Sequence, residues 1–151
     1  MEFGSYLTGF VDGEGCFSVS FNLRSRFSTG IEVRPSFSVS QKKYSLDVLK
    51  RIQDYFHCGG IRYCSNDGTY KFEVRTLSDL TQKVIPHFKM YPLQTAKRFD
   101  FEKFEQICQM MKQNVHLNKK ALASIIEIAY RMNLAGTRRN SKEKLLRLLT
   151  R

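Results

Sequence analysis

Apolar and polar residues alternate strictly along residues 16–24 and again along residues 31–41. The apolar positions are Phe17, Val19, Phe21 and Leu23 in the first segment and Ile31, Val33, Phe37 and Val39 in the second. A period of two places each set on one face of an extended chain, so both segments are predicted to be half-buried strands. Pro35 lacks a backbone N–H and therefore predicts an edge strand or a bulge in the second segment.

A second pair of strands is predicted at residues 59–65 and 69–75, joined by the turn sequence Asn66-Asp67-Gly68. In the later strand the apolar Tyr70, Phe72 and Val74 alternate with the polar Lys71, Glu73 and Arg75. In the earlier strand the inner face belongs either to Ile61 and Tyr63 or to Arg62 and Cys64. The pattern leaves both phases open.

Helical spacing of apolar residues occurs at residues 6–13, and Ser45 and Ser78 are predicted N-caps of helices that run to about Phe56 and Phe88. After a break at Pro92, further helices are predicted at about residues 95–112, 119–132 and 142–150. The order is αββαββα followed by C-terminal helices. This order predicts a single α+β domain over residues 1–151, with helices on one face of an antiparallel sheet and a polar outer face.

The first predicted helix contains two glycines, Gly9 and Gly13, one turn apart. Each glycine costs a helix about 1 kcal/mol relative to alanine, so something must require their small size. Close approach of a second helix backbone would supply that requirement. We interpret the preceding residues 1–5 (MEFGS) as partly appended to the natural chain, with Gly4 and Ser5 suited to starting a helix.

The charge of the chain favours a polyanionic partner, with nucleic acid first. There are 25 Lys and Arg against 14 Asp and Glu, giving a net charge of +11 and a pI near 9.7. The basic C-terminal tail, which includes Arg138 and Arg139, is expected either along phosphates or as a solvated helix face. No run of 18 apolar residues and no signal-peptide pattern occurs, so we expect a soluble, intracellular protein without a membrane partner.

The nine residues 7–15 (LTGFVDGEG) resemble the LAGLIDADG motif of homing endonucleases, with Glu14 in the final acidic place. The resemblance extends over the whole chain, through FSVSQK at residues 37–42, YPLQTAK at residues 91–97 and NVHLNKKALASIIEIAYRMN at residues 114–133. It implies the homing endonuclease fold, whose antiparallel sheet forms a DNA-binding saddle. One copy of the motif implies the single-motif type, which acts as a homodimer.

The expected dimer interface consists of Leu7, Gly9, Phe10 and Gly13. Glycines at this spacing let two helices pack backbone to backbone, and a two-fold axis would set Glu14 of each copy beside its partner. Paired carboxylates near phosphates favour Mg²⁺, with Mn²⁺ or Ca²⁺ able to substitute in binding. Glu14 is therefore the predicted metal ligand and catalytic residue, and a surface salt bridge is its structural alternative.

The resemblance implies three supporting roles. Asp12 helps to fix the helix end and the interface. Gln41, at the end of the second strand, positions the attacking water, and its alternative is an ordinary surface amide. Lys97 neutralises charge that develops on the phosphate, a role for which Lys42 is a second candidate. The alternative for Lys97 is a simple phosphate clamp or a solvated helix start.

Sequence recognition is expected on the outer strand face, because an antiparallel sheet can enter the major groove. The candidates are Ser18, Ser20, Asn22, Arg24, Arg34, Ser36, Ser38, Ser40, Lys71, Glu73 and Arg75, together with Arg138 and Arg139 of the tail. A solvated sheet face carries similar residue types, so the prediction applies to the set more than to any member.

The function implied is a site-specific endonuclease that hydrolyses double-stranded DNA at a long pseudo-palindromic target. The alternative is an intron maturase, or a DNA-binding or RNA-binding protein on the same fold without cleavage, with intron RNA as a possible partner. The resemblance also implies an organellar intron product, in a mitochondrion or chloroplast.

Overall fold

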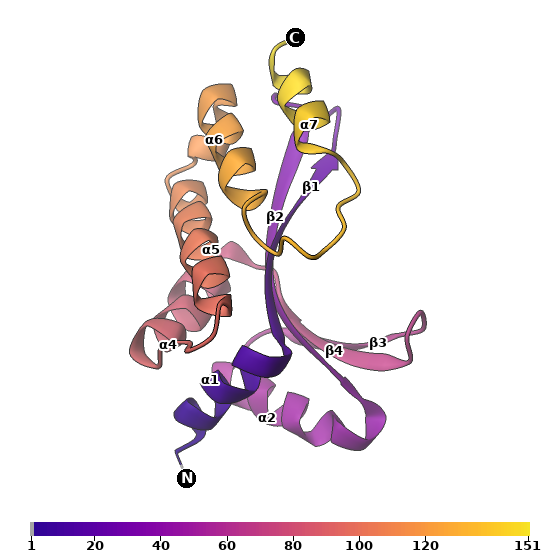
Figure 1. Ribbon diagram of the computed structural model, residues 1–151, viewed down its shortest axis with the longest axis vertical. Coiled ribbons are helices and arrows are strands. Elements are labelled where there is room, and N and C mark those ends of the chain that lie inside the picture. The colour runs from indigo at the N-terminus through magenta and orange to yellow at the C-terminus, as the bar shows by residue number, and fades with distance from the viewer. Residues whose placement is uncertain (1) are drawn as a thin grey trace. The chain divides into compact units, whose positions relative to one another are not determined.

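The computed structural model describes residues 2–151 (Figure 1). The chain divides into two compact units. The first unit contains the residues up to Phe17 and residues 36–98, and the second contains residues 18–35 and 99–151. Strands β1 (Gly15–Leu23) and β2 (Ile31–Lys42) each pass from one unit into the other.

The sheet has four strands in the order β1-β2-β4-β3, where β3 is Gly60–Cys64 and β4 is Thr69–Val74. Strand β4 is antiparallel to both β2 and β3. Gly68 adopts a positive φ of 71° in the turn between β3 and β4, as the sequence Asn-Asp-Gly predicted. All four predicted strands are confirmed within one or two residues of their expected ends.

The register of β3 decides the phase that the sequence left open. Ile61 lies opposite Phe72, and Arg62 lies opposite Lys71. Directly opposite residues share a face of the sheet, and the side chain of Phe72 is fully buried. Ile61 and Tyr63 therefore lie on the same face as Phe72, although Tyr63 is 58% exposed on this edge strand, while Arg62 joins the outer face.

Helix α1 (Phe3–Glu14) runs directly into β1 without a loop (Figure 1). The other helical elements of the first unit are the 3-10 turn η1 (Lys43–Ser45), α2 (Leu46–Phe56), α3 (Leu77–Asp79), the π-helical segment η2 (Leu80–Val84) and α4 (Ile85–Met90). Five phenylalanines, Phe17, Phe37, Phe56, Phe72 and Phe88, meet in its core. Burying each such side chain stabilises the fold by about 1.5–3 kcal/mol.

Helix α5 (Lys97–Lys112) starts in the first unit and continues through the second, which also contains the turn η3 (Val115–Leu117), α6 (Lys119–Ala129) and α7 (Lys142–Leu149). The side-chain oxygen of Asn118 accepts hydrogen bonds from the backbone N–H groups of Lys120 and Ala121 and so caps α6. Ser141 caps α7 in the same way. The buried face of α5 is formed by Phe101, Phe104, Ile107, Cys108 and Met111.

Ser45 stands at the N-cap position of α2 as predicted, but its backbone, with φ −115° and ψ 20°, is not extended and its side chain makes no capping hydrogen bond. The predicted N-cap at Ser78 is wrong. Ser78 lies inside α3, which begins at Leu77. The helical stretch from there to Met90 is continuous but passes through η2 just before Pro86. Proline cannot donate the regular helical hydrogen bond, and a wider turn before it accommodates that loss.

Two other predictions can be compared with the structure. Pro35 predicted an edge strand or a bulge; β2 lies between β1 and β4, but the stretch that contains Pro35 precedes its pairing with β4. Pro35 is tolerated because the pairing with β4 begins only at Phe37. The helix α1 already includes Phe3, and Gly4 packs so closely that an added Cβ would lie 2.6 Å from the ring of Tyr91. The helix therefore begins at Phe3, three residues before the predicted start, while the interpretation of residues 1–5 as partly appended stays a prediction.

Candidate functional site

Helix α1 has one face in the core of its own chain and one face outside it. Leu7 and Val11 are fully buried. Gly9 and Gly13 are exposed, and within the described residues 2–151 an added Cβ at either would meet no atom within 4 Å. We call the side formed by Tyr6, Gly9, Phe10 and Gly13 the open face. Nothing within its own described chain requires glycine at these two positions.

The predicted dimer residues therefore separate into two groups. Gly9, Gly13 and the half-buried Phe10 lie on the open face, where the ring of Phe10 stacks on that of Tyr6 at 6.0 Å. Leu7 has no exposed surface and packs into its own subunit. We reassign Leu7 from the interface to the core, because a side chain without exposed surface has nothing to offer a partner.

The carboxylate of Asp12 is held by the segment that precedes α5. It accepts hydrogen bonds from the backbone N–H of Gln94 at 2.9 Å, from the backbone N–H of Thr95 at 3.1 Å and from the Thr95 hydroxyl at 2.7 Å. Desolvation acts to raise the pKa of Asp12, but these hydrogen bonds and the charge of Lys97 outweigh it and lower that pKa. Asp12 thus stays ionised and fixes the end of α1, as the resemblance implied.

Glu14, two residues further on, is exposed. Its Oε2 accepts a hydrogen bond from Nε2 of Gln41 at 3.2 Å. Gln41 lies at the end of β2, opposite Tyr70 of β4, and the register of the sheet places its amide at the end of the helix. The fold therefore brings together two candidate catalytic residues that are 27 positions apart in the chain.

Lys97 reaches the same place from the start of α5. Its Nζ donates to the backbone carbonyl of Val11 at 2.9 Å and to that of Gly15. A cation at these carbonyls also complements the negative end of the α1 dipole. Glu14, Gln41 and Lys97 thus gather around the last turn of α1, whereas Lys42, the second candidate for the role of Lys97, is exposed at the end of β2.

A buried histidine ties α1 to α2 and α4. The hydroxyl of Thr8 donates to the carbonyl of Tyr91 at 2.9 Å, so it accepts from Nε2 of His87 at 3.1 Å. The remaining ring nitrogen, Nδ1, then accepts from the hydroxyl of Tyr55 at 2.9 Å. This chain of hydrogen bonds requires a neutral ring, and burial lowers the pKa of His87 to about 4.

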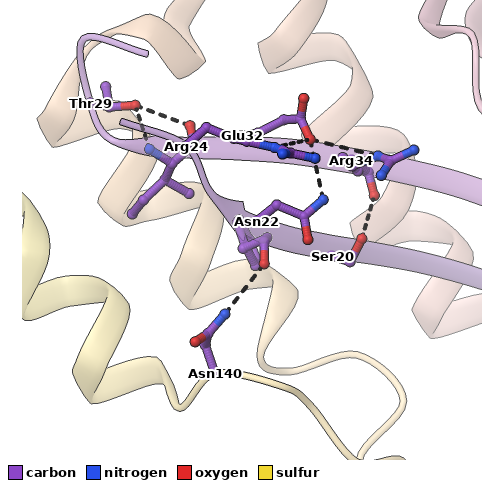
Figure 2. A network of polar contacts seen from close by, with 9 residues as sticks. Ser20, Asn22, Arg24, Thr29, Glu32, Arg34 and Asn140 are labelled. Carbon is purple, nitrogen blue, oxygen red and sulfur yellow. Dashed lines mark hydrogen bonds and ion pairs between the residues drawn. The ribbon is translucent and has the colours of Figure 1, made fainter. Parts of the chain in front are cut away.

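In the second unit, the outer face of β1 and β2 carries a polar cluster around Glu32 (Figure 2). The Glu32 carboxylate accepts a hydrogen bond from Nδ2 of Asn22 at 3.2 Å. It also lies 3.8 Å from Nε of Arg24 and 3.8 Å from Nε of Arg34. Three of the predicted DNA-contact residues are therefore organised by a carboxylate that was not among the candidates.

In the first unit, the outer face of β3 and β4 repeats this arrangement. The Glu73 carboxylate lies 3.0 Å from Nε of Arg75 and 3.7 Å from a terminal nitrogen of Arg62. Arg62 was not a predicted contact, because the phase of β3 could not be fixed from the sequence. These residues line an open hollow of about 440 Å³ at the start of β3, which also includes Asp79.

The other outer-face candidates differ in exposure. Ser20 is exposed, and Lys71 and three of the serines are half-buried, namely Ser18, Ser36 and Ser40. Ser38 is buried at 8% exposure. The exposed and half-buried side chains are accessible to a ligand on this face, whereas Ser38 offers a ligand little surface.

Arg138 and Arg139 of the tail differ in the same way. The guanidinium of Arg138 donates to the carbonyls of Val19 and Ala129, each at 2.7 Å, and lies 4.4 Å from the ring centre of Tyr130. Desolvation lowers the pKa of Arg138. Its donors are committed to the fold of the second unit, so we assign it to holding the loop after α6, while the neighbouring Arg139 is exposed.

Among residues 2–151, no cluster of three or more His, Cys, Asp or Glu side chains is arranged to hold a metal ion. Hard divalent cations bind oxygen donors, and the exposed carboxylate of Glu14 is one such donor. In the same part of the chain no helix is long and apolar enough to span a membrane.

Comparison with known proteins agrees with this geometry. A family profile described as LAGLIDADG endonuclease matches residues 7–108. The chain is 34% identical over 124 residues to the probable intron-encoded endonuclease 2 of Neurospora crassa, which covers 82% of this chain and 27% of that protein. Among curated relatives, this chain spans about a quarter of the length of the first three.

Solved structures give the same result. The homing endonuclease I-TnaI has a TM-score of 0.85 and 38% identity, over 97% of this chain and 95% of that one. I-SmaMI bound to an uncleaved DNA target in the presence of calcium ions has a TM-score of 0.88 and 27% identity, over 98% of this chain and 49% of that one. The α+β architecture is that of the homing endonucleases, and the chain belongs to the LAGLIDADG endonuclease family.

Proposed function

We propose that this chain is one subunit of a homodimeric, metal-dependent endonuclease that cuts double-stranded DNA at a specific site. The observation that carries the proposal is the placement of Glu14. It is an exposed carboxylate at the end of a glycine-lined helix face, with Gln41 and Lys97 at the same helix end. In this proposal residues 1–151 act as a single functional domain.

The open face of α1 supports association with a second copy. Glycine at positions 9 and 13 has no use inside the single chain, but it would let two helices approach backbone to backbone. A two-fold axis along this face would bring the Glu14 residues of both copies to one place. Two symmetric subunits would then read a pseudo-palindromic target and cut both of its strands.

The chemistry of the site fits a hard divalent cation such as Mg²⁺, for which Mn²⁺ or Ca²⁺ could substitute in binding. Glu14 from each subunit would hold it, together with oxygen atoms of the scissile phosphate. When bound, such a cation activates water and stabilises negative charge on the leaving oxygen. The calcium-containing structure of I-SmaMI supports a divalent cation for this chain also.

The residues around Glu14 would orient the reacting groups. The amide of Gln41 fixes one carboxylate oxygen of Glu14 by hydrogen bonding and can hold a water molecule beside it. The ammonium group of Lys97 lies at the last turn of α1, where a phosphate approaching Glu14 would meet its positive charge. Asp12 keeps the helix end in place through its hydrogen bonds to Gln94 and Thr95.

The outer sheet face would supply recognition. Arg24, Arg34, Lys71 and Arg75 can reach base edges in the major groove, and the net charge of +11 favours the phosphate backbone. The intron-encoded relative of Neurospora crassa also supports an origin in an intron, for which an organelle is the expected compartment.

The test is cleavage of a library of pseudo-palindromic duplexes. We expect paired cuts at one site family with Mg²⁺, no cuts with EDTA, and no cuts by Glu14→Gln. The matched control is Asp54→Asn, which removes one exposed carboxylate of α2 and should leave cleavage unchanged. Cleavage by Glu14→Gln at the wild-type rate would refute the proposal. Tight binding of intron RNA without any cleavage would favour the maturase alternative.

A further inference from the structure

Glu32 places a negative charge on a surface that is proposed to meet a polyanion. Its side chain is 23% exposed, between those of Arg24 and Arg34, which are 48% and 38% exposed (Figure 2). An acidic group there weakens attraction to phosphates. Exposed ion pairs of this length add little to folding stability. Neither phosphate binding nor stability therefore accounts for a carboxylate at this position.

The geometry of the contacts indicates another role. Glu32 meets both arginines at Nε, 3.8 Å away in each case. At 3.8 Å neither contact is a hydrogen bond, so the carboxylate attracts each guanidinium without engaging its terminal N–H groups. Those terminal groups form the fork that pairs with the O6 and N7 acceptors of guanine.

Asn22 is oriented by the same carboxylate. Its Nδ2 donates to Glu32, so the amide nitrogen and oxygen are not interchangeable at this position. An asparagine with a fixed amide can offer its oxygen and its second N–H to the N6 and N7 atoms of adenine. Two further hydrogen bonds hold the backbone of β1 and β2 near this cluster: Ser20 donates to the carbonyl of Arg34, and Asn140 donates to the carbonyl of Phe21.

We infer that Glu32 is a positioning residue for sequence recognition, which holds Asn22, Arg24 and Arg34 ready to read purine edges in the major groove. This inference rests on the proposed function. Holding a long side chain in place before binding lowers the entropy lost on binding, by an amount worth about 2- to 12-fold in affinity per side chain. The carboxylate also reduces attraction to unrelated DNA. Both effects raise discrimination between the target and other sequences.

A related arrangement occurs at Glu73 on the other hairpin, which lies 3.0 Å from Nε of Arg75 but meets Arg62 through a terminal nitrogen, at 3.7 Å. Because the two clusters lie on different strands, Glu73 should control a different set of base pairs. The recurrence also gives a second position at which to test the role of a carboxylate between two arginines.

The experiment selects bound sequences from a library of duplexes with randomised pseudo-palindromic sites, in calcium, with full-length protein. Wild type is compared with Glu32→Gln, Glu32→Asp and Glu127→Gln. The last variant is the matched control, because Glu127 is an exposed carboxylate of the second unit that pairs with Lys142 at 3.3 Å and contacts no arginine of the cluster. Affinity for an unrelated duplex is measured in parallel at several salt concentrations.

We expect Glu32→Gln to lose discrimination by about 2- to 12-fold per side chain at a few adjacent base pairs in each half-site. Glu127→Gln should keep the whole sequence profile. Glu32→Asp retains the charge but cannot reach its partners, so it should lose the same discrimination without the rise in affinity for unrelated DNA. If Glu32→Gln does not fold, the sequence profile of Glu32→Asp alone tests whether Glu32 positions the recognition residues.

An unchanged profile in both Glu32 variants would overturn the inference, as would an equal weakening at every position. Absence of any enriched sequence with wild-type protein would refute site-specific recognition itself. The two failures are therefore distinguishable, since the second is already visible before any variant is made.

Discussion

Asp12 and Glu14 are two carboxylates at the end of one helix, and their surroundings differ completely. Asp12 accepts three hydrogen bonds from Gln94 and Thr95. Glu14 is exposed and receives a hydrogen bond from Gln41. The same contrast divides the helix along its length, with Leu7 and Val11 in the core and Gly9 and Gly13 on the open face.

The difference shows how a short motif can serve folding and function together. The residues on the core side of α1 have all their requirements met by their own chain. On the open side, contacts within the described chain do not explain why positions 9 and 13 are glycine. Substitutions on the two sides should therefore fail in different assays, one in stability and the other in assembly or catalysis.

The largest effect is expected for Glu14→Gln. Removing the carboxylate should lower the cleavage rate by at least about 10²–10³-fold, the effect typical of losing a preorganised electrostatic group. The free energy of unfolding should not change measurably, because Glu14 is exposed. Thermal unfolding and single-turnover cleavage on the same preparation check both parts. A large loss of stability in Glu14→Gln would show that Glu14, like Asp12, has a structural role, and would contradict the proposed division of roles.

Gly13→Ala tests the open face. In the isolated chain the new methyl group meets nothing, and alanine should stabilise the helix by up to about 1 kcal/mol. At a close helix interface the same methyl group overpacks by about 1–3 kcal/mol, which weakens the dimer roughly 5- to 150-fold. Sedimentation equilibrium measures the association constant.

Gly4→Ala is the matched control for Gly13→Ala. Its methyl group would collide with Tyr91 inside the chain, so the loss should occur in unfolding and not in association. If both glycine variants changed only stability, the open face would not be an interface.

Asp12→Asn is expected to show the reverse of Glu14→Gln. Losing the charge weakens the three hydrogen bonds to this carboxylate, and one hydrogen bond to a charged group contributes about 1.5–3 kcal/mol. Urea unfolding should therefore show a lower free energy, with cleavage falling only as far as the helix end is displaced. The lowered pKa of Asp12 stabilises the fold above its ordinary pKa near 3.8, and this contribution is lost at lower pH. The variant should lack that acid-dependent step, and a wild-type pH profile below 4 would contradict the prediction.

The smallest effect concerns His87 and the core side of α1. Its folded pKa of about 4 lies below the ordinary value of 6.5, so the unfolded chain binds more protons between these values. The contribution of neutral His87 to the free energy of unfolding is fully present above about pH 6.5. It decreases as the pH drops toward 4, and the loss reaches about 1–2 kcal/mol at pH 5. Chemical unfolding at several pH values measures this slope.

The variant His87→Gln should reduce, but not abolish, the dependence of the free energy of unfolding on pH between 4 and 6.5. His116, whose pKa is also lowered by desolvation, would contribute the remainder. An unchanged slope in His87→Gln would show that the neutral ring does not tie α1 to α2 and α4.

The sequence predicted the strands well because burial on one face imposes a period of two. Phe17, Phe37 and Phe72 all lie where that pattern put them. Ser45 stands at the predicted N-cap position without making the capping hydrogen bond, whereas the cap at Ser78 was wrong because the helix begins one residue earlier, at Leu77. The phase of β3 required its pairing with β4, which residues 59–65 alone do not encode.

Only part of the site could be predicted, because its contacts join residues that are far apart in the chain. The motif identified Glu14, and the resemblance identified Gln41 and Lys97, but their proximity depends on residues far apart in the chain. Arg138 looked like a phosphate contact because its carbonyl acceptors, on Val19 and Ala129, are brought to it only by the fold. Glu32 was not among the candidates, although the acidic Glu73 was, because its contacts with Asn22 and Arg24 arise only when β2 lies beside β1.

The empty space around Gly9 and Gly13 has a consequence for directed evolution. A screen that reports folded yield would accept alanine at both positions and would even favour it, since the isolated helix gains stability. A screen that reports cleavage in cells would reject the same variants if the dimer forms on this face. Libraries intended to change the DNA target of the proposed endonuclease should therefore keep both codons fixed, because stability-based enrichment would remove the glycines before activity is ever measured.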